Sequence, residues 1–235
     1  MEKSSKRIWG WMFYDFATQP YYTLLLTFIF GPYIVGVAEV FFLENGLDIQ
    51  KSEQMAQIVW ANTHLLVGLC IAFIAPFWGY FCQKYNVTRS VVVGSLSISA
   101  VCSGLLWLAY PDGSTLYTSL SLLAIVLIVV GLSQVSIDAQ LIDISEKEGF
   151  GKLSGFGFAF GYFGGILSLV IMLSFFAQNP EGKTILGSVP PFGLAKFDMG
   201  GTRFVGPFCA LWLVIFILPY LYWVLWDDEK KQPSH

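Results

Sequence analysis

Charged residues are scarce in this chain of 235 residues. Lysine, arginine, aspartate and glutamate together make up 12% of the sequence, whereas soluble domains carry about 25%. Hydrophobic residues make up 55%, and the mean hydropathy is +0.64. This composition excludes an ordinary soluble domain and predicts an integral membrane protein. The formal net charge of −3 argues against nucleic acid as a partner, because surfaces that bind nucleic acid are basic.

Cysteine and recognisable catalytic motifs are also sparse. No two cysteines have C-x-x-C spacing, and each lies in or at the end of an apolar run: Cys70, Cys82, Cys102 and Cys209. This pattern favours small hydrophobic side chains over disulfides or metal ligands. No Ser-His-Asp set, paired catalytic carboxylates or phosphate-binding loop is recognisable, so we expect no enzymatic activity, no cofactor and no metal. The start, MEKSSKRIWGW, is not followed by the apolar region and cleavage site of a signal peptide, and none is expected.

Long apolar runs dominate what is present. Each is long enough to cross a bilayer as a helix, which takes about 20 residues. The alternating ten-residue segments of membrane β-barrels do not occur. We therefore predict an all-α membrane protein in which residues 1–235 form a single six-helix transmembrane bundle. The predicted spans are about 11–40, 57–82, 90–110, 116–137, 154–177 and 204–226.

Lysine and arginine are distributed unevenly between the segments that connect these spans. With a cytoplasmic N-terminus, nine lie on the cytoplasmic side: Lys3, Lys6, Arg7, Lys84, Arg89, Lys147, Lys152, Lys230 and Lys231. Four lie on the other side: Lys51, Lys183, Lys196 and Arg203. Because basic residues concentrate in cytoplasmic loops, we predict that both termini are cytoplasmic.

The first span, WMFYDFATQPYYTLLLTFIFGPY, combines an apolar second half with a polar first half. A carboxylate such as Asp15 costs about 2.5–3.5 kcal/mol at the centre of a membrane helix and usually faces a bundle interior or a water-filled path. Asp15 is therefore a candidate proton site or partner for a cation or amine. The alternative is an Asp that caps the N-terminal amides of its own helix. Gln19 lies one turn further on the same face, and Pro20 frees the carbonyl of Phe16 and predicts a bend.

Other polar residues in the spans are weaker candidates. Tyr14 is a candidate for the same substrate or proton site, although packing is the more usual role of such a residue, and Asn62 and His64 in the second span complete the set. A histidine in a membrane is a candidate proton relay, but near the end of a span it also meets water. A second set, at the inner boundary, is predicted to form a gate or structural latch between acids and bases: Lys84, Arg89, Asp138 and Asp143.

Glycines recur every fourth residue in the fifth span, at Gly157, Gly161 and Gly165. Such small-xxx-small faces let helices approach closely. We expect this face to pack against another small-residue span, most plausibly the third.

Three segments together resemble a known family: WMFYDFATQP in the first span, IDAQLIDIS after the fourth and SGFGFAFGYFGG in the fifth. They are similar to the vacuole-effluxer-like branch of the major facilitator superfamily, which includes autophagy-related amino-acid exporters. The resemblance implies one half (3+3 helices) of a twelve-span secondary transporter of a small solute, with amino acids and proton coupling as the expected substrate and mechanism. It also implies a bacterial inner-membrane location and a second six-helix half as partner, either a second copy or a separate chain.

The resemblance has two departures. The chain covers only the first six spans, so the alternative to a transporter is a half-size or truncated membrane scaffold or assembly subunit without transport activity. In the loop after the second span, Gln83 stands where the superfamily has an acid and Lys84 where it has an arginine. The usual charge network of that loop is therefore incomplete.

The predicted topology can be tested by labelling intact cells with a membrane-impermeant thiol reagent. In a parent whose four cysteines are replaced by alanine, Asp48→Cys and Glu181→Cys should react. Lys84→Cys and Lys230→Cys should react only after permeabilisation, because they lie in the cytoplasm. The opposite labelling pattern would show the opposite orientation.

Overall fold

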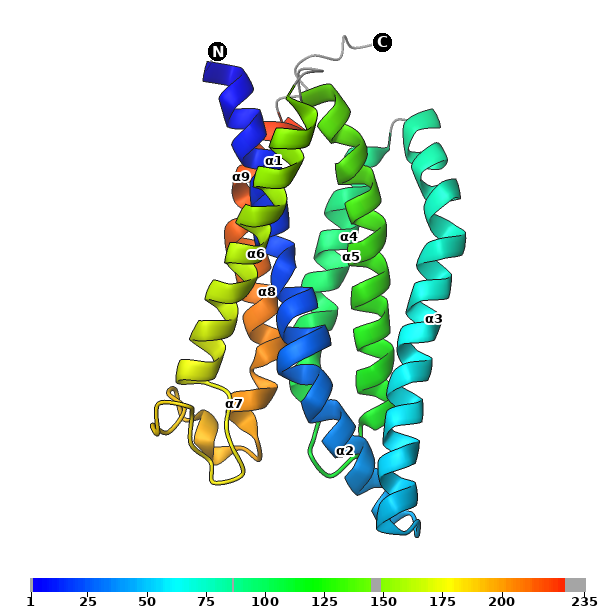
Figure 1. The fold of residues 1–235 in the computed structure, drawn as a ribbon, viewed down its shortest axis with the longest axis vertical. Helices are drawn as coiled ribbons and strands as arrows, with labels where there is room; N and C mark the ends of the chain where they lie inside the picture. Colours follow the sequence, from blue (N-terminus) through cyan, green and yellow to red (C-terminus); the bar gives the residue numbers. More distant parts are fainter. Residues whose placement is uncertain (1, 86, 145–148, 227–235) are drawn as a thin grey trace.

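The computed structural model describes residues 2–85, 87–144 and 149–226, and all regular secondary structure in this part of the chain is helical (Figure 1). The long helices are α1 (Glu2–Pro20), α2 (Phe30–Glu44), α3 (Ile49–Lys84), α4 (Thr88–Leu105), α5 (Leu116–Ile144), α6 (Phe150–Phe175) and α8 (Val205–Phe216). Short helical segments join or extend them: η1 (Tyr21–Phe28), η2 (Leu106–Leu108), η3 (Leu194–Lys196), α7 (Gly200–Arg203), α9 (Leu218–Tyr220) and η4 (Leu221–Leu225).

The described residues contain six helical stretches that are long and apolar enough to cross a membrane, which confirms the predicted count. They are Ser5–Glu44, Ile49–Cys82, Thr88–Leu108, Leu116–Leu141, Phe150–Phe175 and Gly200–Leu225. The second begins earlier than predicted because its polar first turns, IQKSEQMA, continue the helix. An even number of spans places the start of α1 and the end of η4 at the same end of the bundle (Figure 1). Which end faces the cytoplasm stays a prediction.

The first span is interrupted where the sequence predicts a bend. Helix α1 ends at Pro20, η1 continues as a wider π-helical segment, and α2 resumes at Phe30. Pro20 has no N–H to donate to the carbonyl of Phe16. The indole Nε1 of Trp212 on α8 donates to that carbonyl at 3.0 Å instead. A side chain from the sixth span thus satisfies the carbonyl that Pro20 leaves free in the first span.

The glycine face of α6 packs against α1. A Cβ on Gly161 would lie 2.9 Å from Cβ of Asp15, one on Gly164 would lie 2.7 Å from the Phe16 ring, and one on Gly157 would overlap the Trp11 ring. The small residues therefore serve close packing, as predicted. The expected partner was wrong, because this face meets the first span and not the third.

The third span uses its own small residues elsewhere. Helix α4 packs against α5 and α8, and its Ser95, Ser99 and Ser103 are buried. A Cβ on Gly206 of α8 would overlap the carbonyl oxygen of Ser103. Two separate small-residue contacts, α1 with α6 and α4 with α8, therefore hold the bundle together.

Helix α1 lies at the centre of the bundle and α3 at its edge. α1 contacts α5, α6, α8, α9 and η4, and the side chains of Tyr14 and Ala17 are fully buried. α3 packs mainly against α2 and α5 (Figure 1) and exposes large apolar side chains along its length, among them Phe73 and Phe77. The central position of α1 surrounds its polar first half with other helices.

Replacing Gly161 with leucine should destabilise the bundle. The new side chain would push α6 away from Asp15, and overpacking of this kind costs about 1–3 kcal/mol. Gly161→Leu should therefore lower the thermal unfolding temperature and the monodisperse fraction in detergent. Gly155→Leu on the same helix is the matched control, because a Cβ there meets no atom within 4 Å. Equal stability of the two variants would contradict the predicted contact.

Candidate functional site

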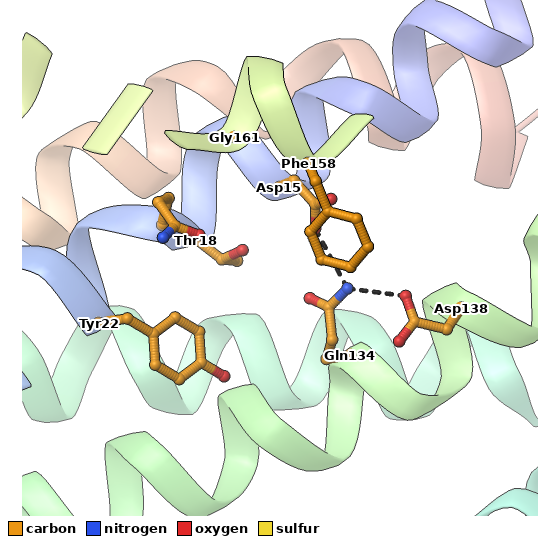
Figure 2. Close-up of a pocket in the computed structure, with 8 residues that line it drawn as sticks. Asp15, Thr18, Tyr22, Gln134, Asp138, Phe158 and Gly161 are labelled. Atoms are coloured by element: carbon orange, nitrogen blue, oxygen red, sulfur yellow. Dashed lines mark hydrogen bonds between the residues drawn. The ribbon is translucent and has the colours of Figure 1, made fainter. Parts of the chain in front are cut away.

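A polar pocket opens between α1, η1, α5 and α6, with a volume of about 170 Å³ (Figure 2). The first span contributes four of its lining residues, and the fourth and fifth spans contribute two each. They are Asp15, Thr18, Gln19, Tyr22, Gln134, Asp138, Phe158 and Gly161. The pocket therefore joins the polar half of the first span to the polar end of the fourth.

Gln134 bridges the two carboxylates of the pocket. Its Nε2 donates to Oδ1 of Asp15 at 3.1 Å and to Oδ1 of Asp138 at 2.9 Å (Figure 2). An ionised carboxylate only accepts hydrogen bonds, so the amide nitrogen must face both acids. Both N–H groups of the amide are thereby used. The two acids come from different spans and share a single neutral donor.

Close packing fixes the position of Asp15. Its side chain is 8% exposed, and the backbone of α6 lies against it at Gly161. Asp15 lies well inside α1, which begins at Glu2, so the alternative that it caps the start of its helix is wrong. Because Gln134 of the fourth span donates to its Oδ1, Asp15 is oriented toward that span. The neighbouring Thr18 hydroxyl donates to the carbonyl of Tyr14 within the same helix at 3.0 Å.

The charge and shape of the pocket restrict what it can bind. None of its eight lining residues is basic, while two are acids and two, Tyr22 and Phe158, are aromatic. Carboxylates with no basic side chain in the pocket lining are costly among apolar helices, and aromatic faces attract cations. Such a pocket suits a proton, a cation or a protonated amine, and it disfavours an anion.

The predicted substrate and proton residues do not all meet here. Asp15 and Gln19 line the pocket together, as their spacing predicts. Tyr14 is fully buried on another side of α1, where its hydroxyl and that of Ser133 are hydrogen-bonded and its ring lies edge-on to Tyr220. Tyr14 is thus a packing residue.

The two candidates on α3 lie outside the pocket lining. Asn62 is exposed. His64 is partly buried, with its ring against Trp60 and its Nδ1 2.9 Å from the carbonyl oxygen of Trp60. The structure therefore brings neither side chain to the two acids.

The residues of the predicted gate are distributed over several sites. Asp138 lines the pocket and accepts from Gln134. The Lys84 ammonium lies 5.4 Å from the centre of the Tyr80 ring, and the Arg89 guanidinium lies 5.7 Å from that of Trp226. The side chain of Asp143 lies outside the described residues. Asp138 thus belongs with Asp15, whereas the prediction grouped it with the bases.

Gln134 is the main pocket residue that the candidate set lacks. Gln134 and Asp138 are four residues apart on α5, the same spacing as Asp15 and Gln19 on α1. Two such acid–amide pairs on apolar spans are a signal that the sequence contains. What the sequence does not contain is the adjacency of the first and fourth spans.

Gln134→Leu should destabilise the protein because it removes the donor shared by the two acids. Hydrogen bonds to charged groups are worth about 1.5–3 kcal/mol, whereas neutral ones are worth about 0.5–1.5 kcal/mol. Gln140→Leu on the same helix is the control, since Gln140 accepts one neutral hydrogen bond from Tyr220. The thermal unfolding temperature should fall further in Gln134→Leu. An equal or smaller fall would mean that the bridge contributes nothing particular to stability.

Comparison of the chain with protein-family models, with curated proteins and with solved structures finds no match in any of the three.

Proposed function

We propose that this chain is one six-helix half of a secondary transporter for a small solute that carries a positive charge or moves together with a proton. The observation behind this proposal is the pair of acids, Asp15 and Asp138, bridged by Gln134 in an otherwise apolar bundle. Ionisable residues within membrane spans are costly and commonly mark substrate or proton pathways. In a purely structural pair, an acid combined with a base would have a lower electrostatic cost than two acids.

We further propose that the chain is of the major-facilitator type and related to the vacuole-effluxer-like branch, with amino acids as the first substrates to test. The bundle of six spans and the polar contributions of the first and fourth spans support this assignment. In such transporters, two bundles rock against each other around a central site. The pocket would then be one wall of that site.

The partner in this proposal is a second six-helix bundle, either a second copy of this chain or a separate chain. The pocket volume of about 170 Å³ is below the roughly 300–1,000 Å³ of most ligand pockets, which is consistent with a site completed by another wall. The flanking helices expose large apolar side chains, including Phe77 on α3 and Tyr162 on α6. We place the assembly in a bacterial inner membrane with both termini cytoplasmic.

Replacing Asp15 with asparagine tests the proposal. The purified, assembled protein would be reconstituted into liposomes containing a pH-sensitive dye, and amino acids and simple amines would be added one at a time. Wild-type protein should move protons or radiolabelled solute with at least one of them. Asp15→Asn should abolish this transport while leaving expression and oligomer size intact, because the amide keeps the shape but cannot ionise.

Asp48→Asn is the matched control for this experiment. Asp48 is an exposed acid at the start of α3, where it pairs with Lys51, and asparagine replaces aspartate well at helix starts. Transport should therefore survive in Asp48→Asn. Undiminished transport in Asp15→Asn would remove Asp15 from the mechanism, and a wild-type assembly that moves none of the compounds would favour a scaffold role.

A further inference from the structure

The connection between α6 and α7 contains two consecutive five-residue turns with the same backbone design. In the first, NPEGK at 179–183, the Asn179 N–H donates to the Lys183 carbonyl and the Gly182 N–H to the Asn179 carbonyl, both at 2.9 Å. In the second, TILGS at 184–188, the equivalent bonds join Thr184 with Ser188 at 2.9 Å and with Gly187 at 2.8 Å. Gly182 and Gly187 both have φ of +76°. The two turns therefore have the same backbone conformation and can be compared by their side chains alone.

The two turns differ sharply in their side chains. The tip of the first, which we call the polar turn, carries Glu181 between a proline and a glycine. The tip of the second, the apolar turn, carries Ile185 and Leu186, which are 73% and 65% exposed. Exposed aliphatic side chains at the tip of a turn are unfavourable in water. The apolar turn therefore favours an apolar environment, whereas the polar turn suits water.

The apolar turn lies at the C-terminal end of α6, where the membrane span ends. The Ile185 N–H donates to the carbonyl of Leu173 at 3.3 Å, and Leu173 belongs to the last turn of α6. Figure 1 shows this connection folded at the lower end of α6 and reaching sideways from the bundle. The exposed apolar side chains of the turn therefore lie near the end of a span that itself exposes Val170 and Phe175.

The backbone of the apolar turn is suited to a lipid environment. Polar backbone groups tolerate the membrane only when they are hydrogen-bonded within the protein. Three of the five N–H groups of the turn, those of Thr184, Ile185 and Gly187, donate to protein carbonyls, and the hydroxyls of Thr184 and Ser188 are hydrogen-bonded to each other at 2.9 Å. Most of the turn's N–H groups are thus hydrogen-bonded within the protein, which lowers the cost of presenting its side chains to the headgroup region of the lipids.

The first residues of the connection are held against α7. Gln178 donates its N–H to the Thr202 hydroxyl at 3.0 Å and accepts the Gly201 N–H at 2.7 Å. Both ends of the segment are therefore held next to α6 and α7. These contacts hold the start of the connection next to α7.

We propose that the apolar turn, residues 184–188, inserts into the bilayer interface at the end of α6 as a lipid-binding anchor, while the polar turn, residues 179–183, faces water. The ligand is the acyl and glycerol region of the lipids, not a protein. This role is independent of what the pocket binds.

Spin labelling in liposomes of phosphatidylcholine and phosphatidylglycerol tests the proposal. A nitroxide would be attached at Leu186→Cys or, as the matched control, at Glu181→Cys in the full chain with its native cysteines replaced by alanine. Collisions with oxygen, which concentrates in lipid, and with a water-soluble nickel chelate would be compared by power saturation. At position 186 oxygen should dominate, and at position 181 the nickel chelate should dominate. A label at Val189→Cys, 63% exposed, provides a second position should Leu186→Cys fold poorly.

Two outcomes would overturn the proposal. Higher collision rates with nickel than with oxygen at positions 186 and 189 would place the turn in water. Low collision rates with both reagents would place it against protein, either a second copy or another chain. Oxygen dominance confined to positions 186 and 189 supports the lipid anchor.

Discussion

The close contact between α1 and α6 is the constraint on which the rest of the structure depends. Because α6 presents Gly157, Gly161 and Gly164 to α1, the two backbones approach closely enough for Gly161 to lie against Asp15, and Phe160 of α6 packs against the aromatic rings of α1 beside them. This contact covers the Asp15 side chain on one side. The carboxylate therefore points toward the fourth span, where Gln134 donates a hydrogen bond to it. The packing of α1 against α6 therefore also determines the geometry of the pocket, since a larger residue at Gly161 would move the Asp15 carboxylate as well as the helix.

The second constraint is the missing hydrogen bond at Pro20. An unpaired carbonyl inside a membrane costs several kcal/mol, and the indole of Trp212 satisfies the one at Phe16. The Phe16 ring also stacks on the Trp212 ring, with centroids 5.4 Å apart. The polar half of the first span is thus fixed from two sides, by α6 through glycine and by α8 through an aromatic donor.

The sequence predicts the elements of this structure better than their neighbours. Hydropathy predicts all six spans because each must hydrogen-bond its backbone polar groups within a helix. Pro20 predicts the interruption of the first span because proline has no N–H to donate to the preceding turn. The partner of the glycine face could not be predicted, because glycine has no side chain that distinguishes one neighbour from another and two spans carry small residues. The bridge by Gln134 was missed for the same reason: it requires knowing that the first and fourth spans are adjacent.

The hydrogen bond from Trp212 to Phe16 also has a consequence for biosynthesis. The two residues are 196 positions apart, and at about 5–20 residues per second the ribosome needs roughly 10–40 s to make that length of chain. During this time the first span, with its free carbonyl and Asp15, exists before the helices that satisfy it. A chain that stalls after the fourth span already contains Gln134, the partner of Asp15. It would still leave the Phe16 carbonyl open to water, lipid or quality-control proteins, so the last helix to be made completes the first.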